Sequence, residues 1–182
     1  DNTVVIFTSD NGGFYKATSN APLRANKGAY YEGGIRVPLI VKWPGVSESG
    51  LTSGVPVTSS DLYPTCLAAA GLPMNQNQHQ DGVNLKPLLN GQGELPERSL
   101  YWHYPHYHGS ANRPSASVRK GDFKLVRWYE DGSEELFNLA NDLAETRNLA
   151  DRQEAKRREL ATDLDRWLKS VKAKMPLPVA GN

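Results

Sequence analysis

Two short apolar runs, separated by a long glycine-rich segment, constrain this chain more than any other feature. The runs cover residues 3–8 and 38–43, and both are rich in β-branched side chains. Uninterrupted runs of this kind are typical of strands covered on both faces, as in parallel sheets. The polar, glycine-rich stretch over residues 12–34 is too long for an ordinary connection and is predicted to be a functional loop.

These strands need neighbours that the first half of the chain does not supply. A sheet buried on both faces requires further strands beside it and helices over each face. The first half contains one helical pattern, which begins at Ser60-Asp61 and ends at Gly71. We therefore expect the rest of the sheet to lie outside this chain, and we interpret the chain as a fragment of a larger domain.

The second half has a different pattern. Residues 98–104, 115–120, 122–129 and 134–138 are predicted strands, and Asp131-Gly132 is a strong hairpin signal. A helix is predicted from about 152 to 172, with one apolar stripe on it. The stripe consists of Leu160, Leu164, Trp167, Leu168 and Val171. This half is predicted to be a four-stranded antiparallel sheet with one helix packed on it.

Composition excludes several classes of partner. Lys and Arg total 21 and Asp and Glu total 20, so no global charge attracts nucleic acid or an anionic membrane. No apolar run approaches the roughly 20 residues that span a bilayer. The single cysteine, Cys66, excludes an intrachain disulfide. We expect neither a nucleic acid nor a membrane as partner.

A carboxylate and an amide follow the first apolar run. Asp10 and Asn11 stand at the carboxyl end of this predicted strand, where ligands bind in open α/β sheets. Their hard oxygen donors suit Ca²⁺ or Mg²⁺. The two glycines that come next allow a sharp turn and close approach of a ligand. The same four residues are also typical of a plain surface turn.

The segment at residues 26–38 narrows the kind of site that Asp10 and Asn11 could form. It reads Asn-Lys-Gly-Ala-Tyr-Tyr-Glu-Gly-Gly-Ile-Arg-Val-Pro. Together with Asp-Asn-Gly at 10–12, it resembles the sulfatase family, whose members carry Lys-Gly-x-x-x-Glu-Gly-Gly-x-Arg-x-Pro after an Asp-Asn-Gly metal motif. Further stretches at 58–65, 81–85 and 135–150 also have family counterparts, so the resemblance covers nearly the whole chain.

The resemblance implies a fold class and a division into domains. The class is α/β, the C-terminal part of an alkaline-phosphatase-like sulfatase fold, with a smaller α+β subdomain. Residues 1–73 would be a piece of the catalytic domain and 97–182 the subdomain. Residues 74–96, which are rich in turn formers, are predicted from their composition to be a surface linker. The missing N-terminal half of the same enzyme would be the principal partner of this chain.

The resemblance also implies roles for individual residues. Asp10 and Asn11 would be metal ligands, for calcium or alternatively magnesium. Lys27 would be a catalytic residue that binds the sulfate group and stabilises charge on the departing ester oxygen. The spacing of Glu32 and Arg36 favours a structural ion pair near the site rather than substrate contact.

The nucleophile of the family is absent from this chain. Sulfatases use a cysteine, converted to formylglycine, within a Cys-x-Pro/Ala-x-Arg motif, whereas Cys66 is followed by Leu-Ala-Ala-Ala. We expect Cys66 to be a buried, inert thiol on the predicted helix. The intact enzyme would hydrolyse a sulfate ester on a carbohydrate or aryl substrate, and this chain alone would be inactive. The family also implies a periplasmic or secreted location.

A histidine-rich run, Trp-His-Tyr-Pro-His-Tyr-His at 102–108, is unusual. We predict that His103 and His106 contact substrate from a loop at the rim of the site. An exposed aromatic loop without such a role is an equal alternative. His103, His106 and His108 would be a transition-metal site only if the strand continued through Pro105, which proline disfavours.

Two other functions remain open from the sequence. The first is a phosphatase or phosphonate hydrolase of the wider alkaline-phosphatase-like group. The second is a non-catalytic folding or interaction module. In that case strand edges left exposed by the missing half would favour self-association.

Overall fold

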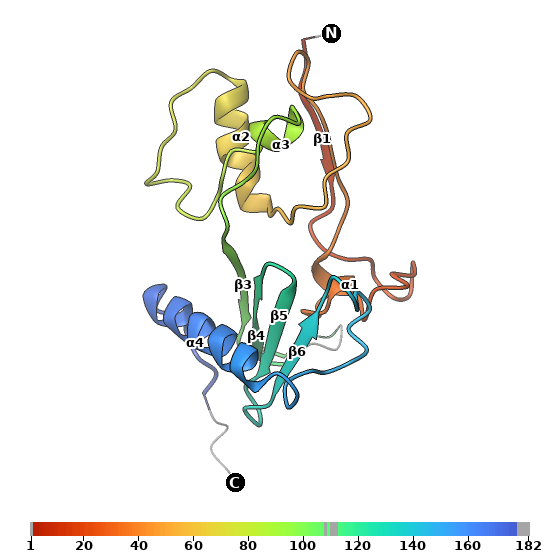
Figure 1. Cartoon of the computed structure of the whole chain (residues 1–182), viewed down its shortest axis with the longest axis vertical. Helices are drawn as coiled ribbons and strands as arrows, with labels where there is room; N and C mark the ends of the chain where they lie inside the picture. Colours follow the sequence, from red (N-terminus) through yellow and green to blue (C-terminus); the bar gives the residue numbers. More distant parts are fainter. Residues whose placement is uncertain (1, 108, 110–112, 178–182) are drawn as a thin grey trace. The chain divides into compact units, whose positions relative to one another are not determined.

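The computed structural model describes residues 2–107, 109 and 113–177. The chain forms two compact units that are interleaved in sequence (Figure 1). Unit 1 contains the residues up to Asp10 together with Val37–Glu97, and unit 2 contains Asn11–Arg36 and the chain from Arg98 onward. The glycine-rich loop, defined from here on as Asn11–Arg36, is thus part of the same unit as the second half. The predicted division at 73 and 97 remains a prediction about the intact protein.

Unit 1 contains both predicted apolar strands. β1 (Val5–Thr8) pairs with β2 (Leu39–Lys42) in antiparallel register, with Phe7 directly opposite Ile40. This pair is therefore antiparallel, and coverage of both faces by strands and helices from outside the chain stays a prediction. Val5, Phe7 and Ile40 are 51%, 61% and 62% exposed. An apolar run indicates that a strand suits burial, but it does not encode the direction of the neighbouring strand.

The helical part of unit 1 binds the predicted linker. A 3₁₀ turn (η1, Ser59–Asp61) leads into α2 (Leu62–Ala69), and α3 (Lys86–Leu89) follows. The Val83 N–H donates to Asp61 Oδ1 at 2.9 Å, and the Leu85 N–H donates to Thr65 Oγ1 at 2.9 Å. Leu85 is buried. Part of the segment predicted as a surface linker is therefore ordered: residues 83–85 bind η1 and α2, and residues 86–89 are helical.

Cys66 is exposed on α2, which corrects the prediction of a buried thiol. The buried residues of α2 are Pro64 and Thr65. A step of one residue turns an α-helix by about 100°, so Cys66 is directed away from Thr65. The apolar character of the helix sequence did not identify its buried side, because a polar threonine accepts the Leu85 N–H there.

The sheet of unit 2 follows the predicted order. β3 (Ser99–Tyr104), β4 (Ser115–Lys120), β5 (Phe123–Trp128) and β6 (Glu134–Asn138) form an antiparallel meander. Val118, Leu125 and Leu136 lie side by side across β4, β5 and β6, with Val118 opposite Leu125 and Leu125 opposite Leu136. This arrangement confirms the predicted antiparallel sheet.

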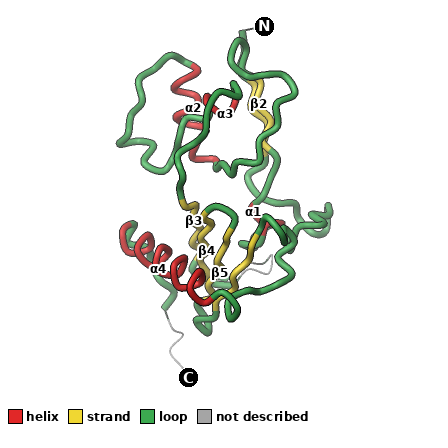
Figure 2. The backbone as a smooth tube through the Cα atoms, viewed as in Figure 1, coloured by secondary structure: helices red, strands yellow, loops and turns green. Residues whose placement is uncertain are grey.

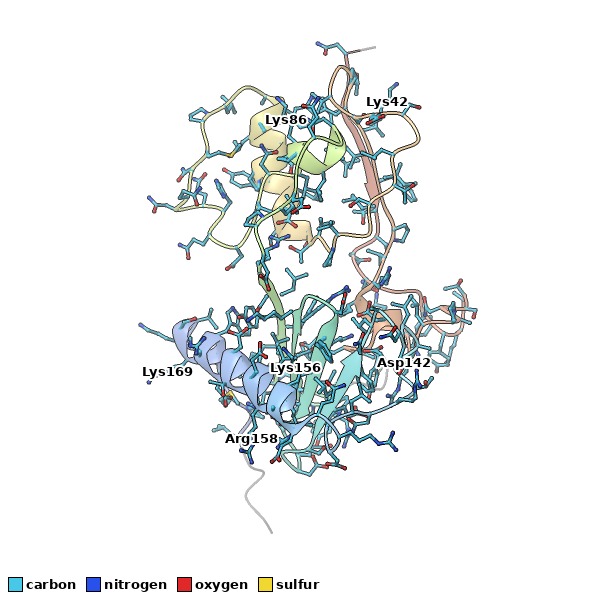
Figure 3. All side chains as sticks on the ribbon, in the orientation of Figure 1. Lys42, Lys86, Asp142, Lys156, Arg158 and Lys169 are labelled. Carbon is cyan, nitrogen blue, oxygen red and sulfur yellow. The ribbon has the colours of Figure 1, made fainter. Side chains whose placement is uncertain are left out.

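One helix packs on this sheet, also as predicted. α4 (Glu154–Ser170) lies across one face (Figure 1) and buries Leu160, Leu164 and Leu168 against it. Val171 follows the end of the helix and is 51% exposed, so it is not part of the buried stripe. Lys156, Arg158 and Lys169, labelled in Figure 3, come from the same helix. Among the described residues, no helix combines the length and apolar character needed to cross a bilayer.

The glycine-rich loop covers the other face of the sheet. A second apolar cluster contains Val126, Trp128, Phe137 and Leu139, and Tyr31 of the loop packs against it. The loop has one short helical turn, α1 (Glu32–Ile35), and is otherwise irregular (Figure 2). Because adjacent strand residues face opposite sides, Leu125 packs toward α4 while Val126 packs in the cluster with Tyr31. Unit 2 is therefore a sheet between one helix and one long loop.

Candidate functional site

Backbone hydrogen bonds hold the glycine-rich loop in one path. The Gly12 N–H donates to the Gly34 carbonyl at 2.9 Å, and the Gly33 N–H donates to the Arg24 carbonyl at 2.9 Å. The Lys27 N–H donates to the Gly13 carbonyl at 3.1 Å. The beginning, middle and end of the loop are thus joined to one another.

Glycine is required where separate segments of the loop cross. A Cβ atom on Gly12 would lie 1.8 Å from the Gly33 carbonyl oxygen. A Cβ atom on Gly33 would lie 2.4 Å from the carbonyl oxygens of Arg24 and Ala25, and one on Gly34 2.0 Å from that of Ala29. All of these neighbours are backbone atoms. The Gly-Gly pair therefore permits a close crossing that no larger residue allows.

Lys27 has a fixed backbone and an exposed side chain. The side chain of Asn20 adds to this support, because its Nδ2 donates to the Gly13 carbonyl and its Oδ1 accepts from the Gly13 N–H, both at 2.9 Å. A lysine presented in this way is able to bind an anionic group that approaches from outside the chain.

The two predicted metal ligands are consecutive in the chain but belong to different units. Asp10 is exposed and ends the first segment of unit 1, whereas Asn11 is half-buried and begins unit 2. Both carry hard oxygen donors, which fits calcium as part of a larger set. The described residues contain no group of three or more His, Cys, Asp or Glu side chains placed to hold a metal. The metal prediction therefore stays a prediction that needs ligands from outside the described chain.

The predicted pair between Glu32 and Arg36 is present, with Arg36 Nη1 3.5 Å from Glu32 Oε2. It is only the outer part of a larger arrangement. Glu32 is 1% exposed, and its Oε1 lies 2.9 Å from Nζ of Lys124, a fully buried residue of β5. Lys124 Nζ also lies 2.8 Å from Oε1 of Glu145. We call Glu32, Lys124 and Glu145 the buried charge cluster.

Burial is the largest influence on Glu145. It raises the pKa of the Glu145 carboxyl, and the Lys124 ammonium opposes that rise. Sequence reasoning missed both residues. Lys124 is a single lysine within the strand pattern Phe-Lys-Leu-Val, and this inward position was the only local signal. Glu145 lies within a stretch that resembles the family, but its partner is far away in the sequence.

Arg24 joins the loop to the rest of unit 2 at a second place. Its Nη1 donates to the backbone carbonyl of Glu145 at 2.9 Å, and its guanidinium lies 3.8 Å from the ring centre of Tyr31. The Tyr31 hydroxyl donates to Glu135. Burial and this hydrogen bond raise the pKa of Tyr31 well above its ordinary value. Tyr31 therefore stays a neutral donor at physiological pH.

The two histidines predicted to contact substrate differ in their surroundings. His103 has both ring nitrogens engaged, Nδ1 with the Tyr129 hydroxyl at 2.8 Å and Nε2 with the Lys174 carbonyl at 2.9 Å. These contacts support a structural role for His103. His106 is exposed, with its ring against that of Tyr104. Substrate contact stays a prediction for both, and His108 lies outside the described residues.

An open pocket of about 510 Å³ is lined by residues at the end of β6 and in its connection to α4. None of the predicted site residues is part of its lining. The lining residues are Asn138, Asn141, Asp142, Arg147, Asn148, Leu149, Arg152 and Gln153. Asp142, labelled in Figure 3, has both carboxylate oxygens occupied by the next turn, where it accepts from the N–H groups of Thr146 and Arg147.

Comparison of the sequence with known families and proteins gives a consistent result. Residues 25–174 match the family described as N-sulphoglucosamine sulphohydrolase, C-terminal. A sulfatase of Formosa agariphila is 45% identical over 159 residues, which cover 82% of this chain and 29% of that protein. Human arylsulfatase A is 39% identical over 137 residues, covering 73% of this chain and 26% of that protein. The chain thus spans less than a third of the length of these relatives.

Solved structures agree with the sequence comparison. A structure of Ps i-CgsB in complex with k-i-k-neocarrahexaose superimposes with a TM-score of 0.79 at 32% identity, covering 92% of this chain and 36% of that one. BT4656 in complex with its substrate D-glucosamine-2-N,6-O-disulfate gives a TM-score of 0.77 at 28% identity, covering 97% and 36%. These neighbours have the alkaline-phosphatase-like fold, which confirms the predicted fold class. The chain belongs to the sulfatase family and corresponds to the C-terminal portion of the sulfatases that it matches.

Proposed function

We propose that the intact protein hydrolyses a sulfate ester and that this chain contributes Lys27 to the reaction. The observation that carries the proposal is the presentation of Lys27, an exposed lysine on a backbone fixed by glycine crossings and hydrogen bonds. The family membership of the chain supports sulfate as the anion.

Lys27 would act at two stages. Before reaction, its ammonium pairs with a sulfate oxygen and orients the ester. As the bond between sulfur and the ester oxygen breaks, negative charge grows on that oxygen, and a nearby ammonium stabilises it more strongly than it stabilises the ground state. The rigid loop backbone matters because an ammonium already in place needs no reorganisation during the reaction.

Asp10 and Asn11 would hold part of a calcium site, with magnesium as the alternative. Their oxygens fit either ion, and the remaining ligands would come from the N-terminal half of the enzyme. When bound, the ion supplies a positive charge that polarises the sulfate group. Asp10 and Asn11 themselves would fix its position by their place just beyond the end of β1 at Thr8.

The nucleophile would be a formylglycine in the N-terminal half. We do not expect Cys66 to replace it, because Cys66 lacks the sequence that surrounds the converted cysteine. We propose that this chain is inactive alone, and that the enzyme is periplasmic or secreted. An N-acetylglucosamine-6-O-sulfatase of Bacteroides thetaiotaomicron is 31% identical over 183 residues, and this likeness supports a sulfated carbohydrate as substrate.

The test is sulfate release by the full-length enzyme with Lys27→Ala. Loss of one group that stabilises the transition state is expected to lower kcat about 10²- to 10³-fold. Lys16→Ala is the matched control, since Lys16 is an exposed lysine of the same loop. It is expected to keep wild-type activity. Hydrolysis of phosphate esters in place of sulfate esters would favour the phosphatase alternative, and equal activity of the two variants would remove Lys27 from the mechanism.

A further inference from the structure

A buried lysine of the sheet holds two carboxylates that contact the glycine-rich loop. Lys124 of β5 is fully buried, and its Nζ lies 2.9 Å from Glu32 Oε1 and 2.8 Å from Glu145 Oε1. Separating either carboxylate from this ammonium would leave buried charges with fewer partners, which is unfavourable. Oε2 of Glu32 is further held by Arg119 at 3.6 Å. The cluster therefore has one well-defined arrangement.

The cluster binds the loop both before and after Lys27 in the sequence. After Lys27, the Glu32 N–H donates to Glu145 Oε2 at 2.6 Å. Before Lys27, Nη1 of Arg24 donates to the backbone carbonyl of Glu145 at 2.9 Å. Glu145 thus binds both ends of the segment that presents Lys27, and Lys124 fixes the side chain of Glu145.

The path from the cluster to Lys27 is short and closely packed. Two residues after Glu32, the Gly34 carbonyl accepts from the Gly12 N–H, and the neighbouring Gly13 carbonyl accepts from the Lys27 N–H. The crossing of Gly12 over the loop leaves no space even for a Cβ atom. In a region packed at this density, a displacement of Glu32 is transmitted to the backbone of Lys27.

We propose that Lys124 is a positioning residue for Lys27, acting through Glu32 and Glu145 to set where the loop presents the Lys27 ammonium. The inference rests on the role of Lys27 in the proposed function. Net stability is a weaker explanation of the cluster, because buried ion pairs contribute little stability compared with packed apolar side chains of equal size. The hydrogen bonds of Glu145 before and after Lys27 instead specify the position of the backbone that carries Lys27.

The experiment compares Lys124→Met with Lys156→Met in the full-length enzyme. Lys156 is the matched control, because it pairs with Glu159 on the surface of α4. Hydrogen–deuterium exchange is measured over residues 11–36, and kcat and KM are measured with para-nitrophenyl sulfate. Lys124→Met is expected to speed amide exchange in this segment by about tenfold or more. It is also expected to lower kcat by about 10- to 100-fold with a smaller change in KM, since a misplaced Lys27 affects mainly the transition state.

Two outcomes would overturn the proposal. One is unchanged exchange over residues 11–36 in Lys124→Met, and the other is a kcat within about twofold of wild type. If wild-type enzyme releases sulfate neither from para-nitrophenyl sulfate nor from N-acetylglucosamine 6-sulfate, the proposed function fails, and the exchange comparison alone then decides the positioning role. If Lys124→Met does not fold, Glu145→Gln takes its place. Faster exchange around Lys27 in that variant supports the proposal, and unchanged exchange contradicts it.

Discussion

Single glycines of this chain differ sharply in how much change they tolerate. Gly34 packs against backbone carbonyls that cannot move aside, whereas Gly54 has no atom within 4 Å of the position a Cβ would take. Both are simply glycines in the sequence. The difference arises because residues 26–29 fold back over Gly34, and that contact is set by the path of the whole loop.

Gly34→Ala is expected to destabilise the protein by about 1–3 kcal/mol or more, because its Cβ would lie 2.0 Å from the Ala29 carbonyl oxygen. The free energy of unfolding is measured by urea denaturation. Gly54→Ala serves as the control and is expected to be neutral or slightly stabilising. Equal stability of the two variants would contradict the close crossing of the loop.

Among the elements, α4 is the one whose sequence pattern and packing agree most fully. Its leucines at helical spacing meet the side chains of β4, β5 and β6 that the strand alternation directs to the same face. The same alternation directs Lys124 and Val126 to the opposite face, which the loop covers. Consecutive residues of β5 therefore contact different layers: Leu125 packs against α4, and Val126 packs on the side that the loop covers.

Leu164→Ala is expected to destabilise the protein by about 2–5 kcal/mol, because Leu164 is fully buried and the surrounding core cannot collapse completely. Val171→Ala is the control, since Val171 is half-exposed beyond the helix end. Its effect is expected to stay within about 0.5 kcal/mol. Thermal unfolding followed by circular dichroism distinguishes the two results. A small effect for Leu164→Ala would show that α4 does not pack as described.

At the scale of the whole molecule, the chain exposes apolar strand surface. Phe7 and Ile40 face each other across β1 and β2, and both are more than 60% exposed. Neighbouring apolar side chains on a short, accessible strand pair favour association with other chains. This surface supports the proposal that the chain alone self-associates.

The chain alone is expected to elute from a sizing column above the size of its 20.1 kDa monomer. Phe7→Glu combined with Ile40→Lys is expected to shift elution toward the monomer, because each strand then carries a charge in place of an apolar side chain. Leu177→Glu is the control, since Leu177 is 89% exposed and lies in unit 2. A monomeric wild-type chain would refute self-association through this surface.

The sequence by itself determined the positions of the strands, the two main helices and the loop motif. These features depend on local periodicity and on short patterns such as Lys-Gly-x-x-x-Glu-Gly-Gly, which neighbouring residues display directly. The pair between Glu32 and Arg36 was also predictable, because four residues separate them within one helical turn.

Only the tertiary structure decided which distant residues meet. Lys124 is 92 positions from Glu32, and Glu145 is 113 positions from it, so no local pattern relates them. The exposure of Cys66 and the engagement of both His103 nitrogens likewise depend on segments elsewhere in the chain. Periodicity shows which side of an element is apolar, but the partner of a buried charge is chosen by the packing of the whole unit.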